Sequence, residues 1–331
     1  MEKTIPQITF AELICSWEAD RLSAGAVLPY TATRAAQKAR LLNPWIGSME
    51  VDEMQPADIR TALHELRDAG GRFGKGLAAA TLRACHLAGT QAIDWVIKNE
   101  ICERNVFKNA QRPKANYRRS NFLTLSEAEM LLGCLQRSLT RYACDRDIEK
   151  ASFCIAAIIA LATGMRRGEI FALEWKMCDL DGFQIGIAQA VKGGGSIGLP
   201  KSSAGIRRIA IGTGLAETLR TAKDWQDANM GSRTWTNGYF VICNADGHMA
   251  SMNAFEHWWR SWVEDHGWHG LKFHELRHTH ATLMLAGGID AKTLQVRLGH
   301  SSADITMSCY AHAIPLADKA PAQILDTALF G

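Results

Sequence analysis

The longest apolar stretch of the sequence, residues 151–162, must lie in a protein core, because it is too short to cross a lipid bilayer. A break at Gly164 follows it, and a charged segment begins there. We predict a buried helix over residues 148–162 and a new helix that begins at Arg166. Glu169 lies one turn further on, where it could brace Arg166 or act only as an ordinary acid of the first helical turn.

Length and composition indicate a folded protein of two domains. The chain has 331 residues, and 47% of them are hydrophobic, which is enough to fill two cores. It has no uncharged apolar run of about 18 residues, the length that a membrane span needs, and its N-terminus lacks the apolar segment of a signal peptide. Nine cysteines without paired spacing predict reduced thiols. We therefore expect a cytoplasmic location.

The first third of the chain is predicted to form a helical bundle. Apolar residues favour helices over residues 10–23, 30–42, 56–69 and 77–99. Four cations of this region are candidate DNA contacts. One pair shares a helix face one turn apart and the other pair lies in a glycine-rich loop: Arg34 with Lys38, and Arg72 with Lys75.

A basic segment, residues 108–120, follows the predicted bundle. It holds no acid and five cations, which are Lys108, Arg112, Lys114, Arg118 and Arg119. The net charge of the whole chain is only +3, so composition alone does not indicate DNA. A solvated linker could have this composition. A basic connector between two domains would also suit a protein that wraps a DNA duplex, because cations that neutralise phosphates release counterions.

The second domain is predicted to be mainly α with a small three-stranded β-sheet. Glycine- and serine-rich turns separate three candidate strands at residues 183–191, 196–200 and 206–211. Further helices are expected from residue 214 and over residues 253–265, 275–287, 291–298 and 303–310.

Five residues of this domain form a set suited to a phosphodiester: Arg166, His274, Arg277, His300 and Tyr310. The planar guanidinium groups match phosphate oxygens. Imidazoles transfer protons near neutral pH, and a phenol can attack phosphorus. The set therefore predicts chemistry on a phosphate ester.

The order and surroundings of these residues resemble the tyrosine recombinase (phage integrase) family. TGMRRGE, HELRH and LGH precede Tyr310 in the order of the family, and the match spans Thr163 to His312. The segment LPKSSAGIRRIAI resembles the lysine hairpin of the family, which makes Lys201 the candidate catalytic lysine. Lys192 also flanks a strand and remains the alternative.

The resemblance implies a role for each of these residues. Arg166 and Arg277 would bind the non-bridging oxygens of the scissile phosphate, and Tyr310 would attack the phosphorus. The proton transfers and the remaining phosphate contact would come from His274 as the base, Lys201 as the acid for the leaving 5′-oxygen and His300 as a donor to the phosphate.

The resemblance also implies an architecture and partners. After a tail of residues 1–8, we expect a helical core-binding domain over residues 9–107, the basic linker, and a catalytic domain over residues 121–331. Residues 317–330 would form a C-terminal helix that docks on a neighbouring protomer. The implied partners are double-stranded DNA with specific core sites, a homotetramer on synapsed DNA and an accessory directionality protein, in a cytoplasmic, nucleoid-associated enzyme without a cofactor.

Three other interpretations compete with this one. A type IB topoisomerase would share the chemistry, and a non-catalytic DNA-binding protein could share the fold. Zinc binding by His274, His278 and His280 is disfavoured, because HELRH places Arg277 where a metal would lie, and a cation beside a metal is unfavourable. We interpret His278 and His280 as ordinary partly buried histidines, and Arg167 and Arg297 as cations of the surface or of the DNA contact.

Overall fold

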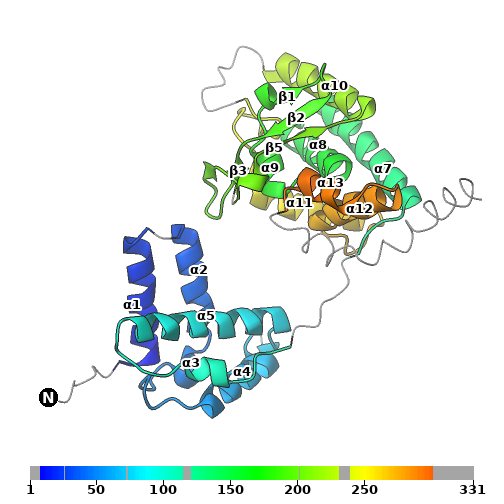
Figure 1. The fold of residues 1–331 in the computed structure, drawn as a ribbon. Helices are drawn as coiled ribbons and strands as arrows, with labels where there is room; N and C mark the ends of the chain where they lie inside the picture. Colours follow the sequence, from blue (N-terminus) through cyan, green and yellow to red (C-terminus); the bar gives the residue numbers. More distant parts are fainter. Residues whose placement is uncertain are drawn as a thin grey trace, which may run out of the picture. The chain divides into compact units, whose positions relative to one another are not determined.

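The computed structural model describes residues 8–25, 27–71, 74–114, 121–200, 202–230 and 239–300. The chain divides into two compact units, Met1–Arg118 and Arg119–Gly331 (Figure 1). Each unit has a hydrophobic core of its own. Mainly helical architecture with small antiparallel sheets confirms the predicted fold class.

The described part of the N-terminal unit is a helical bundle. Its helices are α1 (Phe10–Ser23), α2 (Pro29–Arg40), α3 (Asn43–Ile46), α4 (Pro56–Ala69), α5 (Ala79–Lys98) and α6 (Val106–Asn109). The four predicted helices are present, with ends that differ by two residues at most. Local chemistry fixes their starts: Thr9 and Glu12 cap α1 reciprocally, and Pro56 stands in the first turn of α4. The rings of Phe10 and Phe107 stack 5.9 Å apart and join α1 to α6.

A buried helix, α8 (Ile148–Thr163), lies at the centre of the C-terminal unit, as its sequence predicts. It contacts α7 (Leu125–Cys144), α10 (Thr213–Met230), α11 (Met252–Asp265) and α12 (Phe273–Ala286). The shorter helices of this unit are α9 (Arg167–Phe171), α13 (Ala291–Leu298) and the 3-10 turns η2 (Trp175–Met177) and η3 (Ser203–Gly205). A helix that is apolar on nearly all sides is stable only when neighbours cover it, so α8 organises the unit.

The sheet differs from the prediction in its strands. The three-stranded sheet consists of β1 (Cys178–Asp179), β2 (Gln184–Ile187) and β5 (Arg207–Ala210), in the order β1-β2-β5. A separate hairpin pairs β3 (Ala190–Val191) with β4 (Ile197–Gly198). The single strand predicted over residues 183–191 is therefore wrong. Gln189 donates to the carbonyl of Ala172 and to the Glu174 carboxylate, both at 2.8 Å, and this interrupts the strand.

Some predicted elements lie outside the described residues, namely the helices at 303–310 and 317–330. Within the part of the chain that the structure describes, no helix is long and apolar enough to cross a membrane.

Gly164 ends α8 in the left-handed conformation, with a φ of +68°. A Cβ atom at this position would lie 2.7 Å from side-chain carbons of both His280 and Leu298. Helices α12 and α13 thus pack directly against the turn between α8 and α9. Only glycine combines this backbone conformation with this close approach.

We predict that Gly164→Ala lowers the free energy of unfolding by about 2 kcal/mol or more, because it adds backbone strain to a steric clash. Gly214→Ala is the matched control. Nothing lies within 4 Å of a Cβ at Gly214, which lies in α10, so that change should be neutral or slightly stabilising. Urea unfolding of both variants tests this, and equal effects would contradict it.

Candidate active site

The turn between α8 and α9 positions Arg166. The backbone N–H of Arg166 donates to the Glu169 carboxylate at 2.9 Å, and its Nη1 donates to the same carboxylate at 2.9 Å. The contact anticipated from the sequence is therefore present. Arg166 keeps 41% of its side-chain surface exposed, whereas Glu169 keeps only 3%. The carboxylate thus holds both the backbone and the guanidinium of Arg166, while part of this side chain stays open to solvent.

Three consecutive carbonyl groups at the C-terminal end of α13 each accept a hydrogen bond from a different arginine. Arg297 O accepts from Arg207 Nε at 2.6 Å, Leu298 O from Arg277 Nη2 at 2.9 Å, and Gly299 O from Arg166 Nη2 at 2.8 Å. Such terminal carbonyls have no partner within their own helix and carry partial negative charge. They therefore bring the three guanidinium groups together without neutralising them.

Arg277 is tied to two chain turns at once. Its Nη1 donates to the carbonyl of Gly164 at 2.6 Å, in addition to the bond with Leu298, and only 3% of the residue is exposed. The arginine thus connects the end of α8 to the end of α13.

Arg207 is the residue of this cluster that the sequence analysis missed. Its Nη1 and Nη2 donate to the two oxygens of Glu169, at 3.2 and 3.0 Å, and 5% of its side chain is exposed. Burial alone would raise the pKa of Glu169, but the hydrogen bonds and charge of Arg207, with a smaller contribution from Arg166, hold this pKa below its usual value. The carboxylate is therefore ionised and shared by two arginines.

Charges in the cluster do not balance. Arg166, Arg207 and Arg277 contribute three positive charges and Glu169 contributes one negative charge, which leaves two positive charges in a half-buried setting. An anion bound there would have a more favourable electrostatic energy than it would beside the same charges in water.

Both candidate histidines lie in the field of these arginines. Protein atoms around the ring of His274 remove part of its hydration and lower its pKa, and the charges of Arg277 and Arg166 lower it further. Burial lowers the pKa of His300 to about 4, and the same two arginines contribute. Both imidazoles are consequently neutral at pH 7, and each can supply one donor and one acceptor.

Neither His278 nor His280 forms a group of metal ligands with these two histidines. His280 turns away, because its Nδ1 lies 3.1 Å from the carbonyl of Leu161 and its Nε2 accepts from Arg297 Nε at 3.0 Å. The rings of His274 and His278 contact edge to face, with centroids 4.9 Å apart. Among the residues that the structure describes, no group of three metal-binding side chains comes together.

Two cations interpreted as surface or DNA contacts have protein partners, and in the case of Arg167 the ion pair is itself exposed. Arg167 pairs with Glu256. Arg297 donates to His280 and also to the carbonyl of Ala210, at 3.0 Å, because α13 packs against β5. Arg297 is therefore half-buried, and its role as a surface or DNA cation stays a prediction.

Two of the six candidate catalytic residues, Lys201 and Tyr310, lie outside the described residues. Lys192 follows β3 at the turn of the β3–β4 hairpin, where its backbone N–H donates to Ser196 O at 2.7 Å. The choice between the two lysines remains a prediction.

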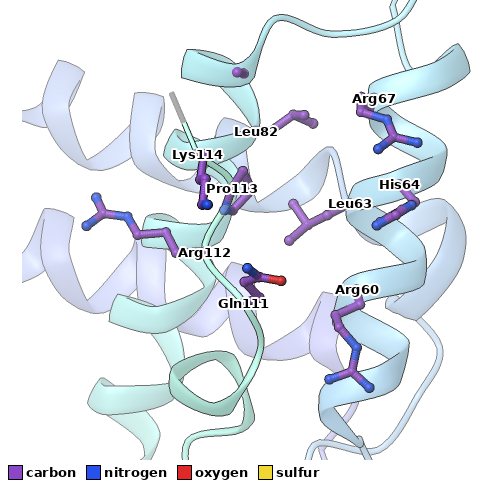
Figure 2. A pocket seen from close by; sticks show the side chains of 10 residues that line it. Arg60, Leu63, His64, Arg67, Leu82, Gln111, Arg112, Pro113 and Lys114 are labelled. Atoms are coloured by element: carbon purple, nitrogen blue, oxygen red, sulfur yellow. The ribbon is translucent and has the colours of Figure 1, made fainter. Parts of the chain in front are cut away.

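The candidate DNA contacts lie in the N-terminal unit and the linker. Arg34 lies over the ring of Tyr30 on α2, which also carries Lys38, and Lys75 is exposed in the loop after α4. Lys108 pairs with Asp94 at 2.7 Å. Arg112 and Lys114 line a groove beside α4 (Figure 2), whereas Arg72, Arg118 and Arg119 lie outside the described residues.

Residues 121–315 match the model of the phage integrase family, and the chain belongs to that family. It is therefore a tyrosine recombinase. The ICEBs1 integrase of Bacillus subtilis (strain 168) is 25% identical over 260 residues, which cover 77% of this chain and 67% of that protein. The chain spans only about half the length of some other relatives, 45% and 52%.

Solved structures share the fold at low sequence identity. The Tn1549 transposon integrase, in complex with a circular intermediate DNA, superposes with a TM-score of 0.76 at 20% identity over 96% of this chain and 99% of that one. A lambda integrase tetramer bound to a Holliday junction has a TM-score of 0.65 at 19% identity, over 92% of this chain and 78% of that one. This likeness confirms the predicted fold class.

We predict that Arg207→Ala lowers the free energy of unfolding by about 3 to 5 kcal/mol, because it leaves a buried carboxylate short of its main partner. Arg207→Lys should fall in between, since an ammonium group supplies the charge but not the two parallel hydrogen bonds. The control is Arg208→Ala, the next residue of β5, whose side chain is exposed. Measured by urea unfolding, the control should lose at most about 0.5 kcal/mol of its free energy of unfolding. If Arg207→Ala and Arg208→Ala lost equal stability, Arg207 would not be the residue that positions Glu169.

The buried histidines predict a pH dependence of stability. Burial, aided by Arg297, lowers the pKa of His280 to about 4. An unfolded histidine titrates near pH 6.5, so between about pH 6.5 and 4 the unfolded chain binds more protons than the folded one. Stability should be fully present above pH 6.5 and fall as the pH drops towards 4.

We expect His280→Gln to lose less stability than the wild type between pH 6.5 and 4. The difference in the free energy of unfolding should reach about 3 kcal/mol, which corresponds to a pKa shift of this size. His257→Gln, at an exposed position on α11, should leave the profile unchanged. Urea unfolding at several pH values, followed by tryptophan fluorescence, measures the effect. Parallel profiles for His280→Gln and the wild type would contradict the assignment.

Proposed function

We propose that this protein is a site-specific DNA recombinase that cuts and rejoins duplex DNA through a covalent 3′-phosphotyrosine. The carrying observation is the cluster at the end of α13, where neutral carbonyls hold Arg166 and Arg277 beside two neutral histidines. Its two uncompensated positive charges suit a phosphodiester, whose negative charge spreads over the non-bridging oxygens as the phosphorus is attacked.

The proposed reaction exchanges one ester bond for another. The phenolic oxygen of Tyr310 forms a bond to phosphorus while the bond between phosphorus and the 5′-oxygen breaks. His274 accepts the phenol proton, and Lys201, or Lys192 in its place, gives a proton to the leaving oxygen. Reversal with the 5′-hydroxyl of another strand rejoins the DNA, so no external energy source is consumed.

The protein groups supply the positive charge that the reaction needs. Arg166 and Arg277 would neutralise the non-bridging oxygens, and His300 would donate its single N–H to one of them. A neutral His274 is free to accept a proton at pH 7, which supports its role as the base. The reaction as proposed uses no metal or organic cofactor.

The proposed partners follow from the neighbours of this chain. The Tn1549 and lambda integrases were solved with DNA, and one lambda complex is a tetramer on a Holliday junction. These complexes support duplex DNA as the substrate and a homotetramer as the assembly. Docking by residues 317–330, an accessory directionality protein and association with the nucleoid stay predictions from the sequence.

We predict that Tyr310→Phe abolishes covalent attachment to DNA, because phenylalanine lacks the attacking oxygen. The substrates are duplexes from the DNA that flanks the gene, each with a nick near the cleavage position that traps the adduct. Wild-type protein should give an SDS-resistant adduct, whereas Tyr310→Phe should bind the same duplex without forming one. Tyr142→Phe, on α7, is the matched control and should react like the wild type. An adduct that survives in Tyr310→Phe would overturn the assignment of the nucleophile.

A further inference from the structure

Gln295 is a buried polar residue of α13 to which the proposed reaction gives no role. It keeps 8% of its surface exposed, and it lies just before the three carbonyl groups that hold the arginine cluster. A buried amide costs free energy unless its polar atoms find hydrogen-bond partners. Both polar atoms of this amide have partners, and the partner of its nitrogen is His300.

Gln295 holds His300 on both sides of its backbone. The N–H of His300 donates to the carbonyl of Gln295 at 3.1 Å, and Nε2 of Gln295 donates back to the carbonyl of His300, also at 3.1 Å. The first bond belongs to the ordinary ending of a helix at a left-handed glycine, here Gly299. The second bond is additional, because it comes from a side chain. Together the two bonds restrict both backbone dihedral angles of His300.

Lys292 fixes the direction of the Gln295 amide. Its Nζ donates to Oε1 at 3.1 Å from one turn earlier on the same helix. Because an ammonium group can only donate, Oε1 faces Lys292 and the amide nitrogen faces His300. A reversed amide would place Oε1 against the carbonyl of His300, where two acceptors repel each other.

His300 is a residue for which exact placement matters. It follows directly on Gly299, whose carbonyl accepts from Arg166, and its ring lies in the field of the arginine cluster. A donor to a phosphate oxygen is most effective when it is held in place before the phosphate arrives. A displacement of about 1 Å can cost about a hundredfold in rate. A side chain that fixes the backbone of such a donor therefore affects the rate without touching the phosphate.

We propose that Gln295 is a positioning residue of the recombination reaction, which holds the backbone of His300 so that the imidazole points at a non-bridging oxygen of the scissile phosphate. Lys292 supports Gln295 by orienting its amide. The inference rests on the proposed function, because it assigns a support to one of the proposed phosphate donors. Gln295 acts through His300 rather than on a reacting atom.

A double-mutant cycle tests the coupling between Gln295 and His300. The variants of the full chain are Gln295→Met, His300→Ala and the two combined. Methionine is an unbranched side chain like glutamine, but it cannot donate to a carbonyl. The measured quantity is the single-turnover rate of adduct formation on a nicked duplex from the flanking DNA, at saturating protein so that affinity does not enter. Val296→Ala, at the exposed neighbouring position of α13, is the matched control.

We expect Gln295→Met to lower this rate about tenfold in the wild-type background and at most about twofold in the His300→Ala background, because a misplaced imidazole matters only while it is present. Val296→Ala should keep the wild-type rate. An equal loss in both backgrounds would mean that Gln295 supports the helix end or the arginines instead. No loss in the wild-type background would mean that the bond to His300 has no role in the reaction. Either result overturns the proposal.

Lys292→Met decides the question by the same comparison if Gln295→Met does not fold. Lys292 is exposed, so its replacement leaves the core intact. Loss of the bond that orients the amide should lower the rate about threefold, and only in the background that keeps His300. Equal rates in Lys292→Met and the wild type, or an equal loss in both backgrounds, would then contradict the proposal.

Titration of His300 separates this inference from the proposed function, because it needs no DNA. The ring signal is observed by NMR in protein with isotope-labelled histidine and is identified by its loss in His300→Ala. Burial, aided by the nearby arginines, lowers the pKa of His300 to about 4. The wild-type signal should therefore stay constant from about pH 7 to about 5.5. In Gln295→Met the ring is less firmly held in its buried place, so its pKa should rise and the signal should begin to titrate in this range. A signal that stays constant would overturn the proposal.

The two readouts distinguish two failures. If the wild type forms the adduct but neither the rate nor the titration changes in Gln295→Met, only the positioning role is refuted. If the titration changes as expected while the wild type forms no adduct, the recombinase chemistry is refuted and the hold of Gln295 on His300 stands.

Discussion

The C-terminal end of α13 is the feature on which the candidate site depends. Helix ends leave carbonyl groups without partners, and here three of them accept from arginines that come from β5, α12 and the α8–α9 turn. Gly299 makes this possible, because its left-handed conformation, with a φ of +66°, stops the helix, and a Cβ there would lie 2.7 Å from Arg207. Segments far apart in the sequence thus meet at a single helix end.

Neutral acceptors have an electrostatic consequence that acidic partners would not have. An arginine bound to a carboxylate loses most of its field, whereas one bound to a carbonyl keeps its charge. Among the ion pairs of the described residues, Glu169 is the carboxylate that offsets the cluster, and it lies between Arg166 and Arg207. Burial is the main cause that lowers the pKa of His274 and of His300, and the remaining field of the arginines lowers both further. The arginines thus offer positive charge to a bound anion and add to the burial that keeps both imidazoles neutral.

The sequence predicted what depends on local pattern and missed what depends on distant contacts. The helices were found because apolar spacing and Gly164 mark them directly. The single strand over residues 183–191 failed because Gln189 bonds to Ala172 and Glu174, partners that no local pattern reveals. Arg207 was missed for the same reason, since its partners lie 38 and 90 residues away. The sequence hint was its place in the short basic strand RRIA, two residues before Ile209.

Arg166 shows why the cluster needs guanidinium groups rather than ammonium groups. A guanidinium has five N–H donors in a fixed plane. Among the described residues, the side chain of Arg166 uses one of them on Glu169 and one on Gly299, so donors remain for a phosphate while the plane is held on two sides. The three donors of a lysine lie on one nitrogen, so they cannot span two separate partners as a guanidinium does, and they define no fixed plane. The support from Glu169 and Gly299 thus fixes the direction in which the remaining donors point.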